Sequence, residues 1–229
     1  MTLPKIAGVF LVMSLLANIT AFANGTSRGL RPPAAFDFGA ADDLLRLAAE
    51  SRAHVLPLAL SLMSPVLAIP AGLGFFHILR PAGWTAVFGV TMFFVGMVFV
   101  VLLDVVEVIA ILSVAPAYAS ATEGSRPAIV ALGSSLELGR AVLGYIGHFF
   151  SFGLAQLALG YAIVKVPGIS NWLGGLSFVP AFMLGWMVPV MALRGQPVGP
   201  VVGIGVAMFF IWLMGMSVVL LRWKGQEEL

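Results

Sequence analysis

Long apolar stretches separated by short polar ones dominate the pattern of this 229-residue chain. The longest, from Trp84 to Ser113, is thirty residues of almost continuous apolar sequence that only Asp104 and Glu107 interrupt. At a rise of ~1.5 Å per residue, a helix of this length extends about 45 Å, more than the roughly 30 Å of a bilayer's hydrocarbon core. The pattern therefore predicts a membrane-spanning helix that carries two carboxyl groups.

Five further stretches are long and apolar enough to span, and a polar connection separates the first two spans. In that connection, acidic residues alternate with leucines from about Ala40 to Arg52, which predicts a short amphipathic helix. Val114 to Pro127 is a loop by composition. We therefore expect an all-α polytopic transmembrane helical bundle, a single domain over residues 1–229, with spans at about 6–23, 54–79, 84–113, 141–165, 172–193 and 201–223.

The first apolar stretch has a second interpretation. Lys5 precedes it, and Ala21-Phe22-Ala23 resembles the small-residue site at which signal peptides are cleaved. The stretch is nevertheless just long enough to span, so we take it as the first transmembrane helix. The sequence leaves open whether residues 1–23 are removed.

Composition agrees with the membrane interpretation. Hydrophobic residues make up 60% of the chain and charged residues 10%, whereas a soluble domain carries about 25% charge. Twelve Lys and Arg against ten Asp and Glu leave a net charge of only +2 without a basic cluster, which argues against nucleic acid as a partner. The chain has no Cys, which excludes disulfides and thiolate metal sites. The expected partners are membrane lipids and other subunits of a membrane assembly.

Lys and Arg in the short loops, together with Lys5 ahead of the first apolar stretch, favour an orientation with both termini in the cytoplasm, although counting the arginines of the long first loop reverses the balance. We accordingly expect a multi-pass protein of the bacterial cell inner membrane.

Polar residues on the third and fourth spans form the most informative pattern. Asp104 and Glu107 are three residues apart and share one helical face. The fourth span carries a polar stripe at helical spacing, made of Glu137, Arg140, Gly144, His148 and Ser151. Consecutive spans joined by a modest loop are usually antiparallel neighbours, and Asp104 and His148 then both lie about 8 Å from the midplane. We predict two pairs, Asp104 with His148 and Glu107 with Arg140.

Each member of this polar intramembrane cluster also has a purely structural interpretation. Arg140 with Glu107 or Glu137 can serve as an ion pair that holds two helices together. His148 can be a hydrogen-bonded core residue, a proton-relay partner or, beside glycines, an axial ligand of a macrocycle. Asp104, Glu107 and His148 would also make a three-ligand metal set, although no H-E-x-x-H motif occurs. We predict no cofactor, and the metal site remains an alternative.

Motifs of known catalytic sites do not support an enzyme. Neither a G-x-S-x-G nucleophile pattern nor a GxxxxGK[ST] phosphate loop occurs in the sequence. No catalytic residue is therefore predicted.

The layout resembles a bacterial family of six-helix integral membrane proteins that is catalogued as a domain of unknown function. The similarity rests on Ile6-Ala7-Gly8-Val9, on Pro65 and Pro70 in the second span, on the acidic third span and on Leu138-Gly139-Arg140-Ala141. The resemblance covers most of the chain and implies six helices, but it implies no activity.

Three functions remain open from the sequence. The first is a non-enzymatic membrane protein, either an accessory or structural subunit of a larger assembly or a binder of lipid-like molecules. The second is a small proton-coupled transporter that uses the Asp, Glu, His and Arg cluster of spans three and four. The third is a membrane enzyme with a carboxylate and histidine metal site.

Overall fold

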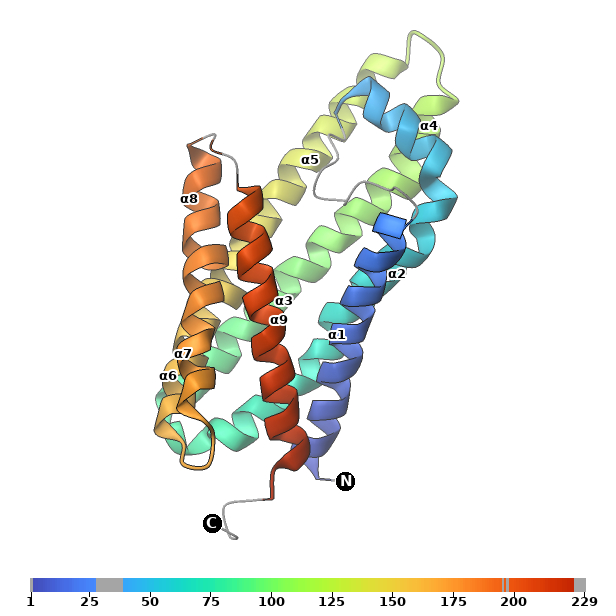
Figure 1. Cartoon of the computed structure of the whole chain (residues 1–229). Helices are drawn as coiled ribbons and strands as arrows, with labels where there is room; N and C mark the ends of the chain where they lie inside the picture. The colour runs from blue at the N-terminus through green and yellow to red at the C-terminus, as the bar shows by residue number, and fades with distance from the viewer. Residues whose placement is uncertain (1, 28–38, 195, 197, 225–229) are drawn as a thin grey trace. The chain divides into compact units, whose positions relative to one another are not determined.

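The computed structural model describes residues 2–27, 39–194, 196 and 198–224, and within them the chain is helical without a strand (Figure 1). The elements are α1 (Leu3–Ser27), α2 (Ala41–Leu79), η2 (Arg80–Ala82), α3 (Trp84–Ile109), η3 (Ala110–Val114), α4 (Ala115–Ala119), α5 (Arg126–His148), η4 (Phe149–Leu154), α6 (Ala155–Lys165), α7 (Asn171–Pro180), η5 (Ala181–Met187), α8 (Val188–Leu193) and α9 (Gly199–Arg222).

Six of the helical segments in the described part of the chain are long and apolar enough to cross a membrane, so the all-α fold with six spans is confirmed. Three of them are longer than a bilayer requires. The segments Ala41–Ala82, Trp84–Ala119 and Arg126–Lys165 contain 42, 36 and 40 residues, whereas about 20 residues cross the hydrocarbon core.

This extra length changes two expectations from the sequence. The amphipathic helix from Ala40 to Arg52 is not separate, because it forms the first part of α2, which continues through Pro57 without a break. The expected loop after Ser113 starts later, because Val114 to Ala119 is helical, and Pro116 follows the π-helical turn η3, whose wider turn accommodates a residue without an N–H.

Three stretches of π-helix lie within the spans: η3, η4 and η5. Pro180 ends α7 directly before η5, and Pro189 lies in the first turn of α8 directly after it. A proline removes one helical hydrogen bond and crowds the preceding turn, and a wider π-helical turn relieves both effects.

Residues of the chain form two compact units. Unit 1 comprises Met1–Leu15, Pro65–Phe99 and Tyr145–Leu229, and unit 2 comprises Leu16–Ser64 and Val100–Gly144. The helices α1, α2, α3 and α5 each contribute residues to both units.

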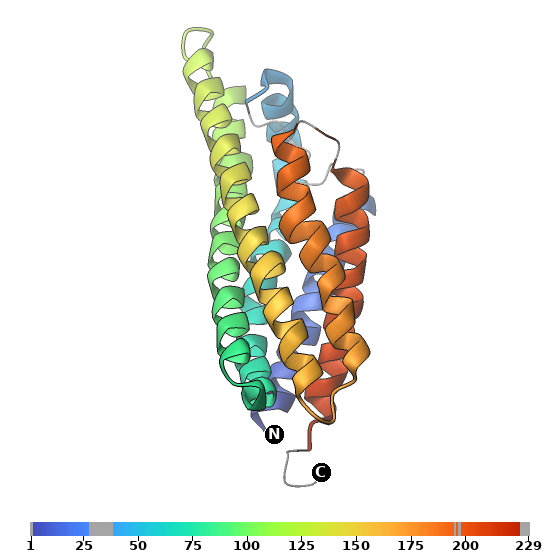
Figure 2. The same cartoon turned by 90° about the vertical axis from the view of Figure 1, so that its left-hand side faces the viewer.

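In unit 1, residues of α1, α2, α3, α6, α7 and α9 form a buried apolar core that includes Phe75, Leu159 and Trp212. The chain reverses between α6 and α7 and again between α8 and α9. As a result, α6 and α9 run in the same direction (Figure 2). Close backbone approach at Gly153 and Gly185 brings η4 against η5, because a Cβ atom added at Gly185 would overlap the backbone of Gly153. Small residues are what allow helices to approach this closely in membranes.

Replacing Gly185 by alanine is expected to lower the free energy of unfolding by about 1–3 kcal/mol, since the added methyl group forces two helix backbones apart. Gly175→Ala on α7 is the matched control, because its added Cβ would meet no described atom within 4 Å and alanine favours helix. Thermal unfolding in detergent measures both variants. Equal melting temperatures for the two would contradict the close approach.

In unit 2, the first part of α2 packs against the later part of α3, η3 and α4. The buried core residues are Leu44, Leu47, Leu58, Ala110, Ile111, Val114, Ala115 and Tyr118. Because the start of α2 meets the end of this helical stretch, the two segments run antiparallel. This pairing sets the relative height of the polar side chains described next.

Candidate functional site

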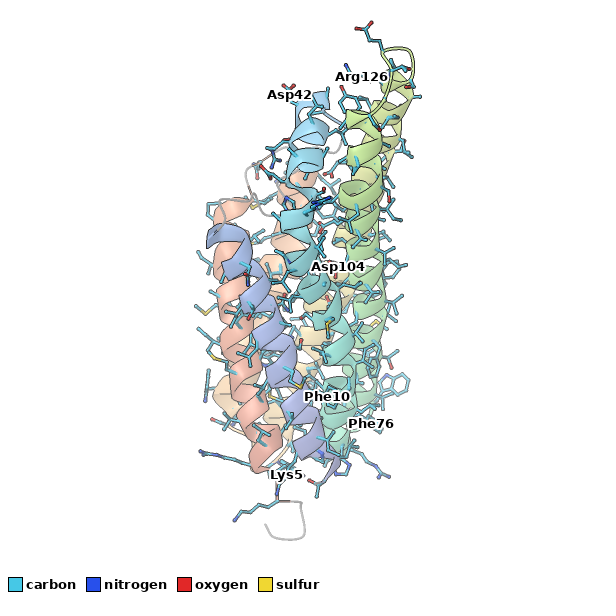
Figure 3. The ribbon with its side chains drawn as sticks, turned by 90° about the vertical axis from the view of Figure 1, so that its right-hand side faces the viewer. Lys5, Phe10, Asp42, Phe76, Asp104 and Arg126 are labelled. Carbon is cyan, nitrogen blue, oxygen red and sulfur yellow. The ribbon has the colours of Figure 1, made fainter. Side chains whose placement is uncertain are left out.

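Charged and polar side chains from three helices of unit 2 are in contact, and Figure 3 shows one of them, Asp104, below Asp42 at the start of α2. Asp104 and Glu107 project from α3 and are 5% and 3% exposed, and Arg140 projects from α5 and is 8% exposed. Ser61 on α2 completes the group. Charged side chains are almost never this buried unless they have partners, so the contacts of each one matter.

Arg140 is the centre of an ion-pair network. Its Nε and Nη2 atoms donate to the two carboxylate oxygens of Glu137 at 2.9 and 2.7 Å, in a bidentate arrangement one turn apart on α5. Its Nη1 atom lies 3.4 Å from Oε1 of Glu107 on α3, which is the pairing that the helical spacing predicted. One guanidinium thus joins two helices through two carboxylates.

A glycine allows α5 to lie close to α3 beside this network. A Cβ atom added at Gly144 would lie 3.0 Å from the side chain of Leu103, the residue directly before Asp104. The glycine in the polar stripe therefore supports close packing of the two helices.

Asp104 has a different environment from Glu107. The Oγ atom of Ser61 donates a hydrogen bond to its Oδ1 atom at 3.2 Å, while its buried Oδ2 atom has no hydrogen-bond partner among the described residues. Within unit 2, no Lys, Arg or His of the described part forms an ion pair with it. Pro65, four residues after Ser61, has no N–H to donate to the Ser61 carbonyl group.

The exposed side chains of α3 give the depth of Asp104 in the membrane. Val105, Ile109 and Leu112 are 39%, 43% and 41% exposed, so the apolar surface of this helix continues past Asp104 to Leu112, where the polar Ser113 follows. At ~1.5 Å per residue, Asp104 then lies about 12 Å inside the end of the apolar surface.

The exposed side chains of α2 give the same depth independently. The hydrogen bond to Asp104 places Ser61 at its height, and the exposed surface of α2 changes from Arg52 to the apolar Val55, which is 49% exposed. These two residues are about 13 and 9 Å from Ser61 along the helix at ~1.5 Å per residue. Asp104 is therefore an ionisable group within the apolar part of a span.

His148 belongs to unit 1, where its ring lies edge-on to Phe152 with the centroids 5.2 Å apart. Since Asp104 belongs to unit 2, the pair that we predicted between them stays a prediction. Among the described residues, no group of three or more His, Asp or Glu side chains is arranged to hold a metal ion.

Polar residues on α2 form part of the site that the sequence analysis did not single out. Arg46 donates to Oδ1 of Asp43 at 3.0 Å and to Oε2 of Glu50 at 3.2 Å, and His54 Nε2 lies 3.4 Å from the same Glu50 oxygen. With Ser61, these residues recur at intervals of three, four, four and seven, which is one helical face. This periodicity is visible in the sequence.

The charge balance of the site limits its chemistry. Asp104, Glu107 and Glu137 provide three carboxyl groups, and Arg140 provides one guanidinium. Leaving two net negative charges in a medium of low dielectric is costly, and a proton or another cation removes that cost. Ion pairing with Arg140 offsets part of this cost for Glu107 and Glu137, whereas Asp104 has no ion pair with a described residue of unit 2.

The fold and this site define a multi-pass membrane protein with a buried acidic cluster and its own internal arginine. No family model, curated protein or solved structure matches the chain. The resemblance to six-helix proteins described from the sequence therefore has no matching family model to support it.

Proposed function

We propose that the protein is a proton-coupled carrier of the bacterial inner membrane and not an enzyme, with Asp104 as the group that binds and releases the proton. The observation that carries this proposal is the buried carboxyl group of Asp104, which accepts one hydrogen bond from Ser61 and has no cationic partner within the described part of unit 2. Ionisable groups at membrane depth commonly mark ion or proton pathways.

Arg140 gives the other two carboxyl groups a different role. Because its guanidinium is always protonated and contacts both Glu107 and Glu137, these carboxylates serve as its counter-ions and keep the site assembled. Protonation of Asp104 then changes the charge of the site without separating the ion pairs. A site that alternates between two charges can couple a solute to the proton gradient.

Basic residues support an orientation for this carrier. In unit 1, Lys5, Arg80, Lys165 and Arg222 lie at the ends of α1, η2, α6 and α9. The positive-inside rule assigns these ends, and with them both termini, to the cytoplasm. The start of α2 then faces the periplasm, the side from which protons enter under a proton-motive force.

The proposal is tested by infrared titration of the full-length protein in liposomes. Between about pH 10 and about pH 4, we expect a carboxylic-acid carbonyl band to appear that Asp104→Asn lacks, because this group gains a proton across that range. Asp42→Asn, at the exposed start of α2, should keep the band. A wild-type spectrum without any band assignable to Asp104 at any pH would contradict a proton-binding role.

Sodium is the other cation that such oxygen ligands accept. The hydroxyl and carbonyl oxygens of Ser61 and the carboxylate of Asp104 resemble in type the donors that bind sodium at irregular points of transporter helices. Repeating the titration with and without sodium chloride separates the two cases, since bound sodium holds the carboxylate ionised.

An accessory subunit of a membrane assembly is the second candidate function. It is favoured by Gly199 and Gly203, which are four residues apart on α9, exposed, and without a described atom within 4 Å of an added Cβ. This spacing suits close packing with another transmembrane helix. A stable complex with another membrane protein in mild detergent, together with an Asp104 that never titrates, would favour this function over the carrier.

A further inference from the structure

We infer that protons reach Asp104 from the end of unit 2 where α2 begins, by way of Glu50 and His54. This inference rests on the proposed function, since it names the route by which the proton-binding group is loaded.

The polar face of α2 provides the route. Asp43, Arg46 and Glu50 form a continuous chain of ion pairs on the part of the helix that precedes its apolar surface. His54 continues this chain inward, with its Nε2 atom 3.4 Å from the Glu50 carboxylate. On the same face, two turns further along, Ser61 donates its hydrogen bond to Asp104.

Burial changes abruptly along this face. The side chain of Glu50 is 33% exposed, whereas that of His54 is 2% exposed, although the two are one turn apart and in contact. His54 also lies between Arg52 and Val55, where the exposed surface of α2 becomes apolar. Glu50 can therefore exchange protons with water, and His54 is the first group inside the boundary.

Glu107 shortens the remaining distance. At ~1.5 Å per residue, His54 is about 10 Å above Ser61 along α2, and Glu107 is about 4.5 Å above Asp104 along the antiparallel α3. Because Ser61 and Asp104 are at one height, Glu107 lies at a height between His54 and Asp104. Along the helix axes, the difference in height between His54 and Glu107 is then about 6 Å, and that between Glu107 and Asp104 is smaller. Both are within roughly one helical turn.

The transfer conserves protons and charge. A protonated Glu50 donates its proton to Nε2 of His54 and returns to the carboxylate. The resulting imidazolium releases its Nδ1 proton toward the Glu107 carboxylate, which passes a proton to the Asp104 carboxylate. Asp104 ends as a carboxylic acid, and Glu50 and Glu107 end as carboxylates. A histidine can serve in this way because its two ring nitrogens lie on opposite sides of the ring.

Other charged groups near this route belong to all three helices of unit 2. They are Arg46 and Glu50 on α2, Glu107 on α3, and Glu137 and Arg140 on α5. Glu137 is the competing entrance, because its side chain is 28% exposed. Its carboxylate is held by two hydrogen bonds from Arg140, however, so protonating it would cost both. The Glu50 carboxylate accepts one hydrogen bond from Arg46, so its protonation costs less than that of Glu137.

The experiment is time-resolved infrared spectroscopy of the full-length protein in liposomes of phosphatidylethanolamine and phosphatidylglycerol. Light releases protons from a caged acid, and the Asp104 carbonyl band is followed in time. His54→Phe should slow the appearance of the band roughly 100-fold, the lower range of what a positioned proton-transfer group contributes. The final amplitude of the band should not change, because Asp104 itself is intact.

Two further variants keep the test decisive. His54→Gln retains a polar side chain but cannot carry a proton as an imidazolium does, so it should slow the band as His54→Phe does, even where the phenylalanine variant folds poorly. Asp42→Asn, exposed at the same end of α2 but off its polar face, should leave the rate unchanged. Wild-type rates in both His54 variants would overturn the route, and slowing by Glu137→Gln alone would move the entrance to α5. A band missing from the wild type would instead refute the proposed function itself.

Discussion

Replacing Arg140 by alanine is expected to lower the free energy of unfolding by about 3–5 kcal/mol, the largest loss among the polar residues of unit 2. The substitution removes the single guanidinium that contacts both Glu107 and Glu137 and leaves a carboxylate that is 3% exposed without its cation. The loss is measured by thermal or denaturant unfolding of the purified protein in detergent.

A triple variant separates the loss of the ion pairs from the loss of packing. Arg140→Ala combined with Glu107→Gln and Glu137→Gln removes the unpaired charges, and most of the lost stability should return. Arg194→Ala is the control for an arginine at an exposed position, where about 0.5 kcal/mol or less is expected. An Arg140→Ala protein as stable as the Arg194→Ala protein would show that the ion pairs do not hold α3 against α5.

The sequence was sufficient for the fold, because each span is a long apolar stretch between polar ones. It placed the helix ends less well, since prolines such as Pro57 and Pro116, which usually indicate a helix end, lie inside continuous helical segments. Pro116 follows the π-helical turn η3, whose wider turn accommodates its missing N–H.

The part of the candidate site whose residues share a helical face was predictable from the sequence. The i, i+3 spacing of Asp104 and Glu107 and the polar stripe around Arg140 were enough to anticipate the ion pair between α3 and α5. Ser61 was not anticipated as a partner of Asp104, because a serine in a proline-rich span gives no signal of its own. Its role follows only from the antiparallel register of α2 and α3, which depends on packing that a single sequence does not display.

The residues of unit 2 whose burial costs stability are the ones that we propose carry the function. Arg140 offsets the cost of burying Glu107 and Glu137, whereas Asp104 has a hydroxyl group for a partner and no guanidinium. A chain selected only for stability would not keep such a carboxyl group inside an apolar surface. Residues that break the rule of paired burial are therefore where function is to be sought.

Gln156 in unit 1 breaks the same rule without carrying a charge. It is 0% exposed on α6, and neither its Oε1 nor its Nε2 atom has a hydrogen-bond partner among the described residues. Phe152, one turn earlier, lies against Phe209 of α9 with the ring centroids 4.7 Å apart, so this face of the helix is in an aromatic environment. A buried carboxamide without partners costs about 1–3 kcal/mol.

Gln156→Leu is accordingly expected to raise the free energy of unfolding by about 3 kcal/mol, because the change removes that cost and buries an apolar side chain of similar volume. Gln196→Leu, at an exposed position after α8, is the matched control and should leave stability nearly unchanged. Both are measured by unfolding in detergent. A destabilised Gln156→Leu protein would contradict the prediction and show that the carboxamide is hydrogen-bonded in the folded protein. A stabilised Gln156→Leu protein would show that the native glutamine lowers stability at this position. Such a result is unusual, because most substitutions in a protein core are destabilising.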